Sequence, residues 1–178
     1  AKVAVLEGIP GHETGDSRLK GFKEAIASSG VTIVASQPAN WERDLGFNVF
    51  QNMLQAHPEI DAVFACNDMM ALGAVEAIEA AGRTGKIRVI GFDAVDDAKK
   101  AMLAGTMVAS VAQFPAEMGK LAVASAVQLI KGETPPADQQ VRAIPTDQAV
   151  RTGPADQHVG AAEAAEHVIP RATDQDIF

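Results

Sequence analysis

Five polar or aromatic residues lie at or after the ends of the most apolar stretches of the sequence, each after a different stretch. They are Arg18, Trp41, Asn67, Asp93 and Gln113. Arginine, asparagine, aspartate and glutamine offer paired hydrogen-bond donors or acceptors that can engage neighbouring hydroxyl groups. An indole offers a flat apolar surface for the C–H face of a sugar ring. Together the five side chains predict a site for a neutral, polyhydroxylated ligand.

Each of these residues also has a simpler structural explanation. Asn67, or Asp68 next to it, could cap the amino terminus of the following helix, and Asp93 could cap another. Trp41 could be a hydrophobic plug, and Arg18 could be a solvated residue on a helix. Residue types alone therefore leave both explanations open.

The elements that must position these residues are visible in the spacing of apolar residues. Short stretches rich in β-branched residues predict strands that are covered on both faces. These stretches are residues 3–8, 31–36, 61–66, 87–92 and 108–113. Helical spacing predicts helices at 16–30, 44–59, 68–85, 96–105 and 115–133.

This alternation predicts an α/β fold, a doubly wound parallel sheet with helices on both faces and right-handed crossovers. In such a sheet the carboxyl ends of the strands converge on one edge, and ligands bind there. All five candidate residues would lie on that edge. This common location favours a shared site over five unrelated structural roles.

The composition excludes several classes of function. The chain has 178 residues, of which 47% are hydrophobic and 21% charged, as in a globular protein of one domain or one and a piece. A net charge of -8 argues against a nucleic-acid partner. No apolar run approaches the ~18 residues that span a membrane. The opening residues lack a signal-peptide pattern, so we expect either a cytosolic protein or one from which a preceding segment has been removed.

Motifs for metal, cofactor or covalent chemistry are absent from the sequence. The four histidines have no metal-ligand spacing, and there is no HExxH motif or Cys/His pair. The glycine-rich segment "GIPGHETG" matches neither a P-loop nor a dinucleotide-binding fingerprint. Cys66 is the one cysteine, and no serine lies in a GxSxG elbow. We therefore expect no metal, no cofactor and no enzymatic activity.

A long part of the chain resembles a known family. The stretch "QPANWERDLGFNVFQNMLQAHPEIDAVFACNDMMALGAVEAIEAAG" is followed by "VIGFDA" and then by "VASVAQFPAEMG" and "KGETP". In order and spacing these segments resemble the ribose-binding-type periplasmic proteins, which capture substrate for bacterial ABC sugar importers. The resemblance covers residues 3 to 135. It implies two α/β lobes that close on a monosaccharide and deliver it to the permease subunits. The location it implies is the periplasm, or the extracellular face with a membrane anchor in a Gram-positive bacterium.

The resemblance also implies roles for the five candidate residues. Arg18 in "SRLKGF" matches the arginine that clasps the sugar, and Trp41 lies where the family has an aromatic residue lining the pocket. Asn67 in "ACND", Asp93 in "GFD" and Gln113 in "VAQFP" match the remaining ligands of the second lobe. This assignment leaves Asp68 as a helix cap or a brace.

The same resemblance predicts the organisation of the chain. Residues 1–113 would form the sugar-binding second lobe, and residues 114–135 a helix that returns to a first lobe preceding residue 1. The segment 136–178 is rich in Pro, Gln and Asp and does not resemble the closing strand of the family. We expect it to be an atypical tail, partly ordered at best.

Two alternatives remain at the level of sequence. The fold is shared by the effector domains of sugar-responsive transcription regulators, and the sequence preceding residue 1 would distinguish the two classes. A small doubly wound enzyme is the third hypothesis, although no pair of nucleophile and base supports it.

Overall fold

The computed structural model describes residues 1–136 and the short segment 167–170. Its centre is one sheet with the strand order β2-β1-β3-β4-β5-β6, in which the first five strands are parallel. The parallel strands are β1 (Lys2–Glu7), β2 (Thr32–Pro38), β3 (Ala62–Ala65), β4 (Arg88–Asp93) and β5 (Ala109–Ala112). The predicted five-stranded parallel α/β sheet is confirmed.

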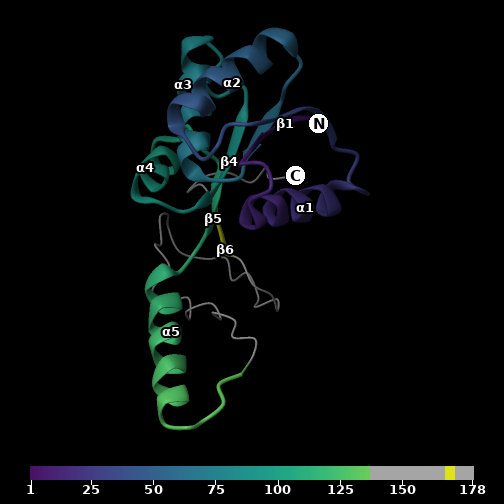
Figure 1. Ribbon diagram of the computed structural model, residues 1–178. Helices are drawn as coiled ribbons and strands as arrows, with labels where there is room; N and C mark the ends of the chain where they lie inside the picture. Colours follow the sequence, from purple (N-terminus) through teal and green to yellow (C-terminus); the bar gives the residue numbers. More distant parts are fainter. Residues whose placement is uncertain (137–166, 171–178) are drawn as a thin grey trace.

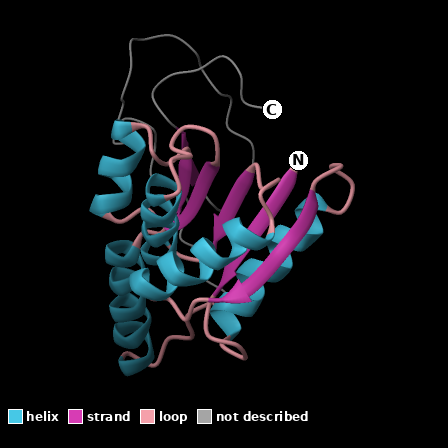
Figure 2. Ribbon diagram, turned by 90° about the horizontal axis from the view of Figure 1, so that it is seen from above, coloured by secondary structure: helices cyan, strands magenta, loops and turns pink. Residues whose placement is uncertain are grey.

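Helices cover both faces of the sheet. They are α1 (Glu13–Ile26), α2 (Arg43–Ala56), α3 (Asp68–Ala80) and α4 (Asp96–Ala104), and a fifth helix, α5 (Pro115–Ile130), follows β5. Helices α2, α3 and α4 lie together on one face, whereas α1 lies on the other (Figure 1). Figure 2 shows the strands running side by side with helices in front of and behind them. This arrangement brings the starts of α1, α2, α3 and α4 to the edge at which the parallel strands end.

The main core lies between the sheet and the α2–α3 pair. Phe50 of α2 and Met70 of α3 are fully buried there, and burial of such a side chain stabilises the fold by about 2 kcal/mol. The two helices approach so closely at Gly73 that a Cβ there would lie 2.1 Å from the carbonyl oxygen of Arg43. The absence of a side chain at Gly73 therefore permits this contact. On the opposite face Phe22 of α1 stacks on Phe64 of β3, with the ring centroids 4.5 Å apart.

Helix α5 differs from the other helices because it extends away from the sheet (Figure 1). None of its residues is buried. Its large apolar side chains are among the most exposed of those that the structure describes, namely Met118, Val123, Val127, Leu129 and Ile130. The helix is therefore not part of the core that α1 to α4 form with the sheet.

The segment 136–178 is described at residue 136 and again at 167–170. Strand β6 (His167–Pro170) pairs antiparallel with β5 at the edge of the sheet. The rest of the predicted tail lies outside the described residues. Among the described helices, none has the length and apolar character that crossing a membrane requires.

Candidate functional site

The structure brings all five candidate residues together at the carboxyl edge of the sheet. Arg18 comes from α1, Trp41 from the loop between β2 and α2, and Asn67 from the residue before α3. Asp93 ends β4, and Gln113 directly follows β5. The guanidinium of Arg18 and the side-chain amide of Gln113 both donate to Oδ1 of Asp93. The amide of Asn67 donates to the carbonyl oxygen of Trp41 over 3.2 Å.

Arg18 is held inside the site and is not a solvated helix residue. Its side chain is 12% exposed, and its Nη1 donates to the carbonyl oxygen of Cys66 over 2.7 Å. Its Nη2 lies 3.3 Å from Asp93 Oδ1, and its Cζ lies 3.9 Å from the ring centroid of Phe92. The stacking and the ion pair fix the plane of the guanidinium, which is the geometry that bidentate recognition of hydroxyl or carboxylate oxygens needs.

Asp93 is oriented from two sides. Burial raises the pKa of its carboxyl above the ordinary value, while the charge of Arg18 and the hydrogen bond from Gln113 act in the opposite direction. The side chain is 28% exposed, so part of it faces the open edge of the sheet. The N-cap residue of α4 is Val95, so Asp93 does not cap that helix. A fixed carboxylate between a cation and an amide is a preorganised acceptor for ligand hydroxyl groups.

The backbone that presents Asp93 adopts a conformation rare for residues other than glycine. Asp93 has φ 112° and Ala94 has φ 55°, and such positions cost of order 1–3 kcal/mol each. A buried network holds this turn. The amide N–H of Ala94 donates to Ser110 Oγ over 3.0 Å, and that of Val95 donates to Asp68 Oδ2 over 2.9 Å. Ser110 Oγ in turn donates to Asp68 Oδ1 over 2.6 Å.

Asp68 is thus a brace for the turn that carries Asp93. Its side chain is fully buried, and burial raises the pKa of its carboxyl, against the hydrogen bonds from Ser110 and Val95. The cap of α3 is Asn67, whose Oδ1 accepts from the amide of Met70 over 2.9 Å. Of the two roles predicted for Asp68, the structure shows the brace and not the helix cap. The amide oxygen of Asn67 caps the helix, while its amide nitrogen contacts the loop of Trp41.

Trp41 lies half-buried in the loop between β2 and α2, two residues before α2 begins. Both Asn40 and Trp41 have positive φ, at 52° and 71°. The Cζ of Arg18 lies 5.7 Å from the centroid of the indole, and the ring of His12 packs edge-on against it with centroids 5.9 Å apart. The indole therefore contacts α1 as well as its own loop, and it borders the guanidinium of the site.

Sequence reasoning missed several residues that shape the site. Phe92 supports the guanidinium of Arg18, and its position directly before Asp93 in a predicted strand was the available signal. Ser110 is the one polar residue between apolar neighbours in β5, and a polar side chain inside a buried strand indicates a hydrogen-bonded role.

Cys66 is buried, and burial raises the pKa of its thiol to about 11, so its side chain is not a reactive thiolate.

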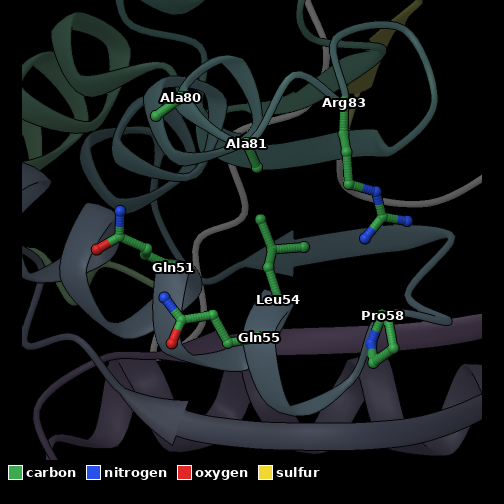
Figure 3. Close-up of a pocket in the computed structure, with 7 residues that line it drawn as sticks. All are labelled: Gln51, Leu54, Gln55, Pro58, Ala80, Ala81 and Arg83. Atoms are coloured by element: carbon green, nitrogen blue, oxygen red, sulfur yellow. The ribbon is translucent and has the colours of Figure 1, made fainter.

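A separate groove of about 460 Å³ is lined by none of these five residues. Figure 3 shows its lining. It is lined by Gln51, Leu54, Gln55, Pro58, Ala80, Ala81 and Arg83. These residues end α2 and α3 or follow them, so the groove lies at the amino ends of β3 and β4. Across residues 1–136 and 167–170, no group of three or more His, Cys, Asp or Glu side chains is placed to hold a metal ion.

The structure is an α/β fold with a cluster of polar side chains at the carboxyl edge of its parallel strands. A family model described as a periplasmic binding protein domain matches residues 1–134. The chain belongs to this family, in its ribose-binding-type sugar-binding branch, and the resemblance seen in the sequence is confirmed.

Individual relatives agree with this assignment. The Ribose import binding protein RbsB of Escherichia coli is 44% identical over 133 residues, which are 75% of this chain and 45% of that protein. The D-allose-binding periplasmic protein of the same species is 41% identical over 140 residues, covering 78% of this chain and 45% of that protein. The chain therefore spans less than half the length of these two relatives.

Solved structures show the same similarity. A periplasmic solute-binding protein of an ABC transporter from Actinobacillus succinogenes, with bound D-allose, has a TM-score of 0.77 and 40% identity. It matches 79% of this chain and 50% of its own chain. The myo-inositol-binding protein of Caulobacter, with bound myo-inositol, has a TM-score of 0.71 and 38% identity, and it matches 76% and 49% of the two chains.

Proposed function

We propose that this chain is the second lobe of the solute-binding component of a bacterial ABC importer and that it binds a monosaccharide. The observation that carries the proposal is the contact between Arg18, Asp93 and Gln113 at the carboxyl edge of the sheet. The names of the relatives support it, since they are import or periplasmic binding proteins for ribose and allose. These names favour an importer over a transcription regulator.

The chemistry of binding follows from the residues that surround the open edge. Asp93 accepts from two neighbouring sugar hydroxyls, while Arg18 and Gln113 hold the carboxylate in place and donate to ligand oxygens. The indole of Trp41 packs against the apolar face of the ring. An analogue that lacks a matching hydroxyl leaves one of these polar groups unpaired and is rejected.

In this proposal, uptake requires another lobe in addition to the one that this chain forms. A first lobe preceding residue 1 closes on the sugar held by the five residues, and the ligand favours the closed state through contacts that the open state lacks. The exposed apolar residues of α5, among them Val123, Val127 and Ile130, supply a face that packs on that lobe. The closed protein then presents the sugar to the permease from the periplasm, or from the extracellular face when anchored. No bond of the sugar changes in this process, so the chain is not an enzyme.

Isothermal titration calorimetry on the full-length protein that carries this chain tests the proposal. D-ribose, D-allose and myo-inositol form the ligand panel, and we expect at least one to bind tightly. Gln113→Ala should weaken that ligand about tenfold or more, because a hydrogen bond to a charged group is lost and Asp93 becomes less fixed. Gln55→Ala, an exposed glutamine in the separate groove, is the matched control and should leave binding unchanged. Equal effects of the two substitutions would contradict the placement of the site.

A further inference from the structure

The six-membered ring of Trp41 lies in a slot formed by two glycines. Gly8 follows β1, and Gly15 is a buried residue in the first turn of α1. A Cβ added at Gly8 would lie 2.1 Å from Cζ2 of Trp41, and one added at Gly15 would lie 2.9 Å from Cη2. Real Cβ atoms essentially never come so close to another heavy atom. We call the space between these two glycines the glycine slot.

The backbone does not explain why Gly15 is a glycine. Neither Gly8 nor Gly15 is among the residues with positive φ, and Gly15 has helical geometry. Alanine is a better helix former than glycine at such a position. Gly21 provides a comparison within the same helix, since nothing lies within 4 Å of a Cβ built there. The steric requirement at Gly15 is therefore the space taken by the indole.

The glycine slot holds the six-membered ring of the indole, on the loop that carries Trp41 to the edge of the sheet. The backbone of Trp41 is held in place by the hydrogen bond from the Asn67 amide to its carbonyl oxygen, over 3.2 Å. The ring edge contacts the slot, while the guanidinium of Arg18 lies 5.7 Å from the ring centroid. A methyl group at Gly15 would displace the ring from the slot. With its backbone held, the displaced indole would change its position relative to the guanidinium of Arg18, which lies 5.7 Å from the ring centroid.

We propose that Gly15 is a specificity-determining residue: by accepting the distal ring of Trp41 in the glycine slot, it leaves room for a sugar larger than a pentose. The inference rests on the proposed function, because it takes the edge near Arg18 and Asp93 as the sugar site. The indole is broader than a phenyl ring, but its extra width lies in the slot and does not occupy the site. The upper limit of ligand size is therefore set by Gly15 together with Trp41.

Calorimetry on the full-length protein tests this with two ligands that differ by one hydroxymethyl group, D-ribose and D-allose. We expect wild-type protein to bind both. Gly15→Ala should weaken D-allose about tenfold more than D-ribose, a change typical of one carbon-sized alteration in a pocket. Gly21→Ala is the matched control, with the same gain in helix propensity and no contact, and it should leave the ratio of the two affinities unchanged.

A double-mutant cycle separates the slot from a general loss of stability. In a Trp41→Phe background the distal ring is absent, so Gly15→Ala should no longer alter the ratio, and the double variant should melt at the temperature of Trp41→Phe or above. An unchanged ratio in Gly15→Ala, an equal change in the Trp41→Phe background, or a wild-type protein that binds D-ribose and not D-allose would each overturn the inference. If wild-type protein binds no sugar at all, the proposed function itself fails.

Discussion

Asn67 has two structural contacts that a single substitution to alanine would remove together. Its Oδ1 caps α3 through the amide of Met70, and its Nδ2 faces the loop of Trp41 at the edge of the site. The cap and the proposed ligand contact therefore do not exclude each other. They use different atoms of one side chain, so substitutions that keep one atom type and remove the other can separate the two roles.

The first prediction concerns this separation. Asn67→Ala should lower the free energy of unfolding by about 1 kcal/mol, the usual value of an N-cap, and should also weaken sugar binding. Asn67→Ser keeps a capping oxygen and lacks the amide, so it should recover most of the stability and little of the affinity. Urea denaturation and calorimetry on the full-length protein measure the two quantities. Wild-type affinity in Asn67→Ser would show that Asn67 is a helix cap and nothing more.

The second prediction concerns pH. Burial raises the pKa of Asp93 above the ordinary value, so protonation of this carboxyl begins at a higher pH than in an exposed aspartate. In the proposed site the ionised carboxylate accepts hydrogen bonds from the sugar hydroxyls. The affinity for the sugar should therefore reach its full value above the raised pKa and should fall as the pH falls through that pKa. Asp93→Asn should bind more weakly and lose this pH dependence, as followed by calorimetry between pH 7 and the acid limit of the folded state. An identical pH profile in the variant would assign the titration to another group.

At the scale of elements, the turn between β4 and α4 depends on groups from two other elements. Asp68 belongs to the start of α3 and Ser110 to β5, and both are fully buried beneath the turn. Their hydrogen bonds satisfy the amides of Ala94 and Val95 and so stabilise a backbone that is otherwise unfavourable. The position of Asp93 is thus set by the packing of three neighbouring elements.

The third prediction tests this brace. Ser110→Ala removes the acceptor for the Ala94 amide and the donor to Asp68, leaving buried polar groups without partners at a cost of about 1–3 kcal/mol in unfolding free energy. Sugar affinity should fall as well, because the turn presenting Asp93 relaxes. Ser28→Ala, at an exposed position after α1, is the control and should change neither quantity. A loss of stability with unchanged affinity would limit Ser110 to a structural role.

The order of strands and helices could be predicted from the sequence. The apolar stretches that end near Glu7, Ala65 and Asp93 are short and rich in β-branched residues, and the segments between them have the apolar spacing of helices. The gathering of the five candidate residues followed from the geometry of parallel sheets. A brace at Asp68 was predicted as one of two roles, but its partner Ser110 could not be predicted, because the two residues are distant in sequence. The start of α1 at Glu13 was also missed, because the apolar pattern begins only at Leu19.

At the scale of the whole molecule, the five residues lie at one edge of the sheet, which is the sugar-binding face in the proposed function. Arg18 and Gln113 both donate to Asp93 there, and helix α5 extends away with its apolar residues exposed. The matched relatives are more than twice as long as the matched segment. A ligand held from one side forms only part of its contacts and stays in contact with water, which weakens every hydrogen bond to it.

The most direct test of this account compares the isolated chain with the full-length protein in the same calorimetric titration of D-ribose and D-allose. We expect tight binding of at least one sugar by the full-length protein. The isolated chain should bind that sugar at least about 100-fold more weakly, since this ratio corresponds to only about 2.7 kcal/mol of lost contacts. Equal affinity of the isolated chain and the full-length protein would contradict the claim that the chain forms one side of a two-lobe sugar site.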